Sequence, residues 1–306
     1  MLERVALGCG GFGGIGSAPE FFGCGESEAD AFALMDAAWE LGIRWFDTAD
    51  AYGGGRSEAM IGRWIAATGS RPRITTKTFN PTEPGGDFGL AAERVLRRAE
   101  SSLERLGMER VDFYLGHEWD RDVPFAETLD AFERLLKEGL IGAWGLSNVD
   151  AAQLGEALTL GQPALVQNSY SLLEQADAAE VIPLCRQARV VYQAFSPLAG
   201  GWLTGKYRRG EEMPAGSRMT LRPRPYLQFD RDNVYDALAR FEREAADRSV
   251  SMAGLALAWL LGQGVSVVVG PRNLTHFEPL REAVALELTA GEREQLLSIF
   301  GPVAAP

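Results

Sequence analysis

The sequence contains few of the residues that form disulfide frameworks and metal centres. Its 306 residues include three cysteines, Cys9, Cys24 and Cys185, and two histidines. The cysteine count is odd and no two cysteines form a CxxC pair, so the sequence predicts neither a disulfide framework nor a zinc site. We therefore expect no bound metal and a reducing, cytoplasmic setting.

Long apolar runs are also missing. A membrane-spanning helix needs about 18 or more consecutive apolar residues, whereas the most apolar stretch, AGLALAWLL at 253–261, has nine. At the N-terminus (MLERVALG), Glu3 and Arg4 stand where an export signal needs a basic start and a longer apolar run. We predict that this segment begins the first strand and that the protein does not bind membranes.

Positive charge is scarce as well. The 30 Lys and Arg residues are outnumbered by 42 Asp and Glu residues, which gives a formal net charge of −12. Such an acidic surface repels the phosphates of nucleic acids and of anionic lipids. We therefore exclude nucleic-acid and membrane partners and leave the oligomeric state open.

Short β-branched or aromatic segments alternate along the chain with longer segments of helical period. The predicted strands cover residues 4–7, 43–47, 73–77, 111–116, 141–146, 164–167, 190–195 and 265–269. The predicted helices cover residues 27–41, 57–67, 90–106, 124–138, 151–158, 178–187, a pair within 233–263, and 290–300. An apolar stripe along 90–106 and a Thr289–Glu292 capping box support the helices.

This alternation, without a Pro/Ser-rich linker, predicts a single α/β domain over residues 1–306 that folds as a (β/α)8 TIM barrel. The rival is an open doubly wound sheet, which places a glycine-rich turn between its first strand and first helix. Glycines do occur in GCGGFGG at 8–14, but no helix begins there. The context therefore favours the barrel. Residues 198–230 lack periodicity, and loops this long usually have a function.

Polar side chains fall where three predicted strands end. Asp47 ends the second strand, Lys77 ends the third and His117 follows the fourth, while Tyr52 lies five residues after Asp47. In a barrel, residues just past the carboxyl ends of the strands line the rim where active sites are found. We therefore expect these four residues to lie together.

The four side chains suit proton transfer to a carbonyl oxygen. A free tyrosine has a pKa of about 10; an adjacent ammonium lowers that pKa, and a carboxylate keeps the ammonium charged. A histidine nearby can donate a hydrogen bond that orients the carbonyl. The set therefore predicts carbonyl reduction or its reverse, and because no side chain supplies a hydride, a nicotinamide cofactor is implied.

Six segments in order, FDTADAYGGGRSE, TTK, YLGH, GLSN, VQNSYS and FSPLAGGWLTGKY, resemble the aldo-keto reductase superfamily over nearly the whole chain. The resemblance implies a barrel that binds NADP(H), sometimes NAD(H), without a Rossmann domain, the long loop after strand seven covering the cofactor. It implies that Tyr52 is the general acid, that Lys77 and Asp47 lower its pKa, and that His117 orients the carbonyl. The implied cofactor contacts are Ser147, Asn148, Gln167, Phe195, Ser196, Leu198, Gly200, Lys206, Gly270, Arg272 and His276.

The sequence departs from this pattern in two places. Phe195 stands where many members have a tyrosine that stacks on the nicotinamide, so the stacking ring is kept and the hydroxyl is lost. Pro279 and Leu280 stand where many members have a Glu-Asn pair that touches the adenine. Arg272 and His276 are the cations placed to meet a 2′-phosphate, which favours NADP(H).

Two other functions stay open at this point. Potassium-channel β subunits resemble the same superfamily, so a redox-sensing regulatory subunit is one alternative. A sugar dehydrogenase working in the oxidative direction is the other, because the same residues serve both directions. Aromatic residues in the expected rim loops are candidates to line a substrate pocket: Phe21, Phe22, Phe79, Trp119 and Trp202.

Overall fold

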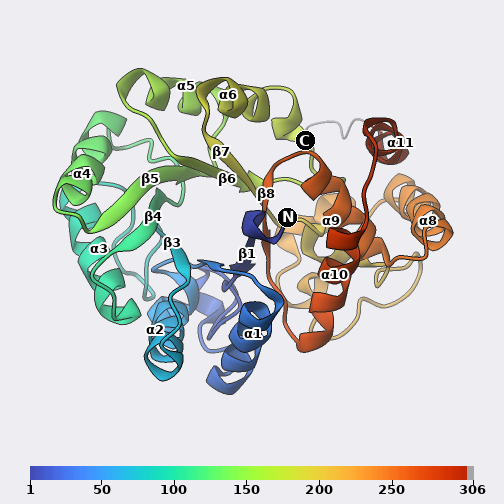
Figure 1. Cartoon of the computed structure of the whole chain (residues 1–306), viewed down its shortest axis with the longest axis horizontal. Coiled ribbons are helices and arrows are strands. Elements are labelled where there is room, and N and C mark those ends of the chain that lie inside the picture. Colours follow the sequence, from blue (N-terminus) through green and yellow to red (C-terminus); the bar gives the residue numbers. More distant parts are fainter. Residues whose placement is uncertain (302–306) are drawn as a thin grey trace.

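The structure, a computed structural model, describes residues 1–301, so the last five residues of the predicted 1–306 domain lie outside it. In the described range, eight parallel strands close into a barrel in which each strand pairs with the next and β8 pairs with β1 (Figure 1). The strands are β1 Val5–Gly8, β2 Trp45–Asp47, β3 Arg73–Thr78, β4 Val111–Gly116, β5 Ile141–Ser147, β6 Leu165–Ser169, β7 Val191–Phe195 and β8 Ser266–Val269.

Helices surround the barrel (Figure 1). One helix follows each of the first six strands: α1 Glu28–Leu41, α2 Arg56–Thr68, α3 Ala92–Leu106, α4 Phe125–Lys137, α5 Ala151–Leu160 and α6 Val181–Ala188. The later helices are α7 Arg218–Leu221, α8 Asp232–Asp247 and α9 Met252–Gly262 before β8, and α10 Glu278–Ala285 and α11 Ala290–Phe300 after it. The order confirms the predicted (β/α)8 barrel. No helix within residues 1–301 is long and apolar enough to cross a membrane.

Local sequence explains where the helices begin and end. Helix α3 buries the predicted stripe, which includes Val95, Ala99, Leu103 and Leu106. It stops at Gly107, whose φ of 63° suits glycine best. The capping box of α11 is confirmed: the Thr289 side chain accepts a hydrogen bond from the Glu292 amide, and the Glu292 carboxylate accepts one from the Thr289 amide.

The inside of the barrel has an apolar layer below a polar one. Side chains alternate between the two faces of a strand, and the lower layer holds a small apolar cluster: Ala6, Trp45, Leu115, Leu165 and Val268. Two residues beyond Trp45 and Leu165 on the same strands stand Asp47 and Gln167. The outer apolar side chains of the strands pack against the helices. The polar layer therefore lies at the carboxyl-terminal rim, above a filled interior.

Several predicted bounds differ from the observed ones by one to three residues, and the first helix after β8 was not predicted. Strand β2 starts at Trp45 because Gly42 (φ 102°) ends α1 and the amide of Ile43 donates to Ala38 of that helix, so Ile43 closes the turn. Helix α10, Glu278–Ala285, was not predicted; its second residue is Pro279, and proline is tolerated in the first turn of a helix. It buries Leu280 and packs against α9.

Residues 198–230 are compact although they lack a period. They contain η5 Ala199–Thr204, α7 and η6 Arg224–Phe229, all too short to show helical periodicity. Trp202 of this segment is fully buried against Tyr207, Phe229 and Tyr235. Its expected place in a substrate pocket is therefore wrong, because it forms the apolar centre of the loop.

Candidate active site

Four polar side chains meet at the carboxyl-terminal rim. Asp47 is the last residue of β2, Lys77 lies near the end of β3, and His117 directly follows β4. Tyr52 lies between β2 and α2, where it opens the turn η3 Tyr52–Gly55. The structure thus brings together the four residues that the sequence analysis assigned to one rim.

The turn that carries Tyr52 depends on glycine. Gly53 and Gly54 have φ values of 59° and 68°, in the left-handed region that favours glycine. A Cβ on Gly53 would lie 2.7 Å from the carbonyl oxygen of Gly13, and a Cβ on Gly10 would lie 3.4 Å from the Tyr52 ring. The glycine-rich segment after β1 therefore packs directly against this turn and fixes the position of the phenol.

Lys77 connects the acid to the phenol. Its ammonium, fully buried, donates to Asp47 Oδ1 at 2.7 Å and to the Thr48 carbonyl at 2.8 Å. The same ammonium lies 5.0 Å from the centroid of the Tyr52 ring and interacts with its hydroxyl. A buried ammonium is stable only with a paired carboxylate and further hydrogen bonds, and Asp47 and Thr48 provide them.

The pKa of Tyr52 differs from the sequence expectation. Burial raises it above its ordinary value, the Lys77 ammonium opposes this rise, and Asp47 adds to it. The expected net lowering is therefore wrong: Lys77 acts in the expected direction, but burial outweighs it. The phenol keeps its proton at neutral pH, which is the form that a proton donor needs.

Lys77 is charged at neutral pH, whereas His117 is neutral. Burial disfavours the charged form of Lys77, but Asp47 and Tyr52 outweigh it, so the pKa of Lys77 is raised. Burial, and then the Lys77 ammonium, lower the pKa of His117 well below its ordinary value. The Tyr52 and His117 rings lie 5.5 Å apart in an edge-to-face arrangement. A protonated phenol and a neutral imidazole, both able to donate, therefore lie side by side.

Polar groups from the next strands extend the site. Asn148, with a φ of 55°, donates from Nδ2 to the His117 carbonyl at 2.8 Å and to Ser147 Oγ at 3.2 Å. Gln167 donates from Nε2 to Asp47 Oδ2 at 2.6 Å and to Gln193 Oε1 at 2.7 Å. Gln193 was not expected from the sequence, although it lies two residues before Phe195 and so shares its side of β7.

The long loop after β7 has an unusual backbone. Ser196 and Ala199 have φ values of 52° and 47°, and Gly200 and Gly201 have φ values of 64° and 99°. A Cβ on Gly200 would lie 2.7 Å from the Tyr226 ring. Left-handed residues in a turn can direct backbone N–H groups toward phosphate oxygens, although the Ala199 and Gly201 amides here donate to the Ser196 and Leu198 carbonyls. The segment that contains Ser196, Leu198 and Gly200 therefore suits a pyrophosphate.

Three cations lie beside this loop, and we call Lys206, Arg218 and Arg272 the cation cluster. Burial, then Arg218 and Arg272, lower the pKa of Lys206. Lys206 forms no ion pair with any residue in 1–301, and Glu26 is the carboxylate that pairs with Arg272. An excess of positive charge at a partly exposed position fits the phosphates of a dinucleotide. Arg218 was missed because its surroundings show no motif.

His276 does not act as a cation in this cluster. Burial, then Lys206 and Arg272, lower its pKa, so the imidazole is neutral at physiological pH. Its Nδ1 accepts a hydrogen bond from the Arg272 amide at 3.1 Å. The expectation that His276 carries positive charge is therefore wrong, while its place beside Arg272 is as expected. Phe195 ends β7 and is partly exposed, and Gly270 directly follows β8.

Two buried carboxylates lie behind β3, on the side away from Lys77. Thr76 donates to Glu58 at 2.5 Å and Thr78 donates to Asp50 at 2.7 Å, while Arg94 donates to Thr78 at 2.9 Å. Burial, and then the negative charge of Glu58, raise the pKa of Asp50 to about 7. Hydrogen bonds from both outward threonines therefore fix the rotation of the strand that carries Lys77.

The raised pKa of Asp50 predicts a pH-dependent stability. Folding favours the protonated acid, so this stabilisation is complete below about pH 4, the unfolded pKa of aspartate, and is lost as the pH rises to about 7. We expect Asp50→Asn to abolish this pH-dependent loss of stability, which amounts to up to about 4 kcal/mol of unfolding free energy. Urea unfolding at pH 5 and pH 8 measures it, with the exposed Asp130→Asn as control; equal pH dependence in wild type and Asp50→Asn would contradict it.

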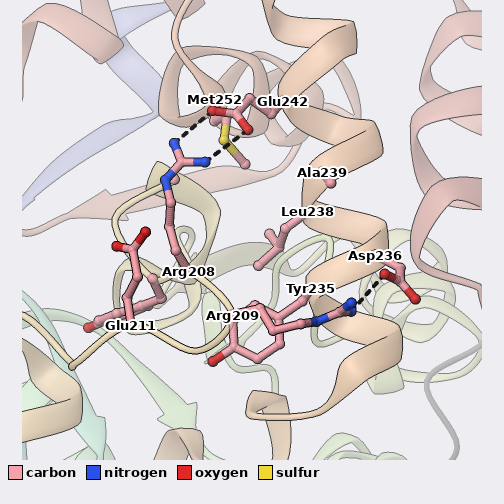
Figure 2. Close-up of a pocket in the computed structure, with 11 residues that line it drawn as sticks. Arg208, Arg209, Glu211, Tyr235, Asp236, Leu238, Ala239, Glu242 and Met252 are labelled. Atoms are coloured by element: carbon pink, nitrogen blue, oxygen red, sulfur yellow. Dashed lines mark hydrogen bonds and ion pairs between the residues drawn. The ribbon is translucent and has the colours of Figure 1, made fainter.

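A cavity lies beside helix α8 (Figure 2). It has a volume of about 310 Å³ and lies between residues 205–211 and α8, with Met252 also in its lining. Its arginines are neutralised: Arg208 pairs with Glu242 at 2.8 Å and Arg209 with Asp236 at 2.6 Å (Figure 2). None of the expected site residues lines it. Within residues 1–301, no group of three His, Cys, Asp or Glu is placed to hold a metal.

Comparison with known proteins agrees with this geometry. The Aldo/keto reductase family matches residues 7–299. The Bacillus subtilis protein called uncharacterized oxidoreductase YrpG is 32% identical over 92% of this chain and 90% of its own length. An Escherichia coli NADH-specific methylglyoxal reductase is 32% identical over 93% and 89%. The solved structure of glycerol dehydrogenase AKR11B4 from Gluconobacter oxydans superposes with a TM-score of 0.84 at 25% identity, covering 99% of this chain and 93% of the other.

The fold and these matches define a barrel oxidoreductase that uses a nicotinamide cofactor. The chain belongs to the aldo/keto reductase family, and it is an NAD(P)H-dependent oxidoreductase that acts on carbonyl compounds.

Proposed function

We propose that the protein reduces aldehydes or ketones to alcohols with NADP(H), also accepting NAD(H), and that Tyr52 is the general acid. The observation that supports this most directly is the buried chain of contacts from Asp47 through Lys77 to the Tyr52 hydroxyl, beside a neutral His117.

The four residues have separate roles in the proposed reaction. The nicotinamide supplies the hydride when it is bound. Tyr52 donates its proton to the carbonyl oxygen, and His117 donates a hydrogen bond that orients that oxygen. Lys77 stabilises the phenolate that remains, and Asp47 keeps Lys77 charged and in place. In the reverse direction the same phenolate accepts the proton of an alcohol.

Cofactor binding is assigned to the rest of the rim. Ser147, Asn148 and Gln167 would hold the nicotinamide carboxamide, and Phe195 would stack on the ring. Ser196, Leu198, Gly200 and Gly270 would line the pyrophosphate and ribose path. The cation cluster, with His276 beside Arg272, would bind the phosphates. The three free cysteines support the proposed reducing, cytoplasmic setting.

The names of two relatives fit this proposal. The Escherichia coli relative is a methylglyoxal reductase, and the Gluconobacter oxydans structure is a glycerol dehydrogenase. One name denotes reduction of a carbonyl compound and the other dehydrogenation of an alcohol, which are the two directions proposed here. A small carbonyl or polyol substrate is therefore included in the test.

A substrate panel tests the proposal. NADPH and NADH consumption would be followed at neutral pH with 4-nitrobenzaldehyde, methylglyoxal and an aldose, and NADP⁺ and NAD⁺ reduction with glycerol and a sugar. We expect turnover of at least one aldehyde, with faster turnover on NADPH. Tight nucleotide binding without turnover of any substrate would instead favour a redox-sensing regulatory subunit, and oxidation of the sugar alone would favour the dehydrogenase.

A further inference from the structure

Glu26 is a buried carboxylate that the proposed mechanism does not use. It lies directly before Ser27, the N-cap of α1, and its backbone is held on both sides. Its amide donates to the Gly11 carbonyl at 2.8 Å, and its carbonyl accepts from the Gly13 amide at 3.0 Å. The side chain is only 6% exposed, so the carboxylate is held in place beside the glycine-rich segment.

The two oxygens of Glu26 have different surroundings. Oε1 accepts a hydrogen bond from Arg272 Nε at 2.8 Å. Oε2 is buried and has no hydrogen-bond partner within residues 1–301. A buried carboxylate oxygen without a donor is costly. This oxygen, which lies against Gly11, is therefore a buried acceptor without a donor.

Glu26 also lies within the cation cluster. Arg272 donates from Nη1 to the Gly216 carbonyl at 2.7 Å, which joins the segment after β8 to the long loop. Glu26 is close enough to Arg218 to favour its charged form, and Arg272 is close enough to Lys206 to oppose its charged form. A carboxylate therefore lies among the cations that are proposed to bind the phosphates of the cofactor.

We propose that Glu26 sets the selectivity between NADP(H) and NAD(H) by competing with the 2′-phosphate for Arg272. This inference rests on the proposed function. A 2′-phosphate is anionic and accepts hydrogen bonds, so Glu26 repels it and holds the guanidinium that it needs. An unphosphorylated ribose presents a hydroxyl donor instead, which a carboxylate accepts. Glu26 thus weakens NADP(H) binding relative to NAD(H) and reduces the preference for NADP(H) that Arg272 provides.

The variant Glu26→Gln tests this directly, because glutamine keeps the size of the side chain and removes its charge. Binding of NADP⁺ and NAD⁺ would be measured by isothermal titration calorimetry without substrate. We expect the Kd for NADP⁺ to fall about tenfold and the Kd for NAD⁺ to change less than about threefold. The control is Glu28→Gln, which removes the same charge from an exposed pair with Arg63 and leaves both constants unchanged.

A double variant separates competition for Arg272 from a general charge effect. Arg272→Ala is expected to weaken NADP⁺ binding more than NAD⁺ binding. Adding Glu26→Gln to Arg272→Ala should then restore much less NADP⁺ affinity than Glu26→Gln gains alone. A full tenfold gain in the absence of Arg272 would overturn the proposed competition.

Unchanged constants in Glu26→Gln, or equal tightening of both nucleotides, would overturn the inference. Failure of the wild-type chain to bind either nucleotide would overturn the proposed function itself. If circular dichroism shows that Glu26→Gln is unfolded, Glu26→Asp replaces it, because the shorter acid withdraws from Arg272. It should shift selectivity toward NADP⁺ by a smaller factor, and no shift would overturn the inference.

Discussion

Tyr52→Phe is expected to lower kcat for carbonyl reduction by a factor of about 10² to 10⁴. The change removes the hydroxyl that donates the proton and keeps the ring that packs against Gly10 and His117. The Kd for NADP⁺ should therefore stay within about threefold of wild type. Stopped-flow measurement of NADPH oxidation gives kcat, and calorimetry gives Kd.

The pH profile supplies a second readout for Tyr52. Burial raises the pKa of the phenol, so it stays protonated through the neutral range. Reduction by wild type should be independent of pH there and should decrease only above about pH 10. Tyr235→Phe removes a hydroxyl that bonds to Asp230 in the outer part of the molecule, and it should leave kcat unchanged. Wild-type turnover by Tyr52→Phe would remove Tyr52 from its proposed role.

Lys77→Met is expected to damage both catalysis and stability. Without the ammonium, the phenolate that forms on Tyr52 loses its charged neighbour, so kcat should fall at least about 10²-fold. The carboxylate of Asp47 is then left buried without its cation, which costs about 3–5 kcal/mol of unfolding free energy. Urea unfolding and NADPH oxidation measure the two effects.

A second substitution separates the two effects of Lys77→Met. Combining it with Asp47→Asn removes both charges, so the unfolding free energy should recover substantially while kcat stays low. Lys137→Met, at the exposed end of α4, is the matched control and should change neither quantity. Normal kcat in Lys77→Met would contradict the role given to the ammonium, and recovery of kcat in the double variant would show that the loss came from misfolding.

Much of the fold could be predicted from the sequence because local patterns determine it. The strand at 111–116 and the helix at 290–300 have the predicted bounds, and the helix is delimited by the Thr289–Glu292 capping box and by Gly301. The helix over Glu278–Ala285 could not be predicted, because its short apolar face becomes evident only when it packs against α9. The helical elements within residues 198–230 are likewise too short to show a period in the sequence.

The site could be predicted only in part. The four residues at strand ends follow from topology, because a parallel barrel brings the carboxyl ends of its strands to one rim. Glu26 and Arg218 lie in irregular segments, and their positions depend on how distant loops pack. The net direction of the Tyr52 pKa also depends on burial, a quantity that residue types do not specify.

Both faces of strand β3 affect the position of the catalytic ammonium. Its inward face presents Lys77, while its outward face is anchored through Thr76 and Thr78 to two acids. A substitution on the outward face of β3, under the helices and away from the substrate, would change the twist of the strand and displace the Lys77 ammonium. The catalytic rate therefore depends on residues at the concealed side of the sheet as well as on those at the open mouth.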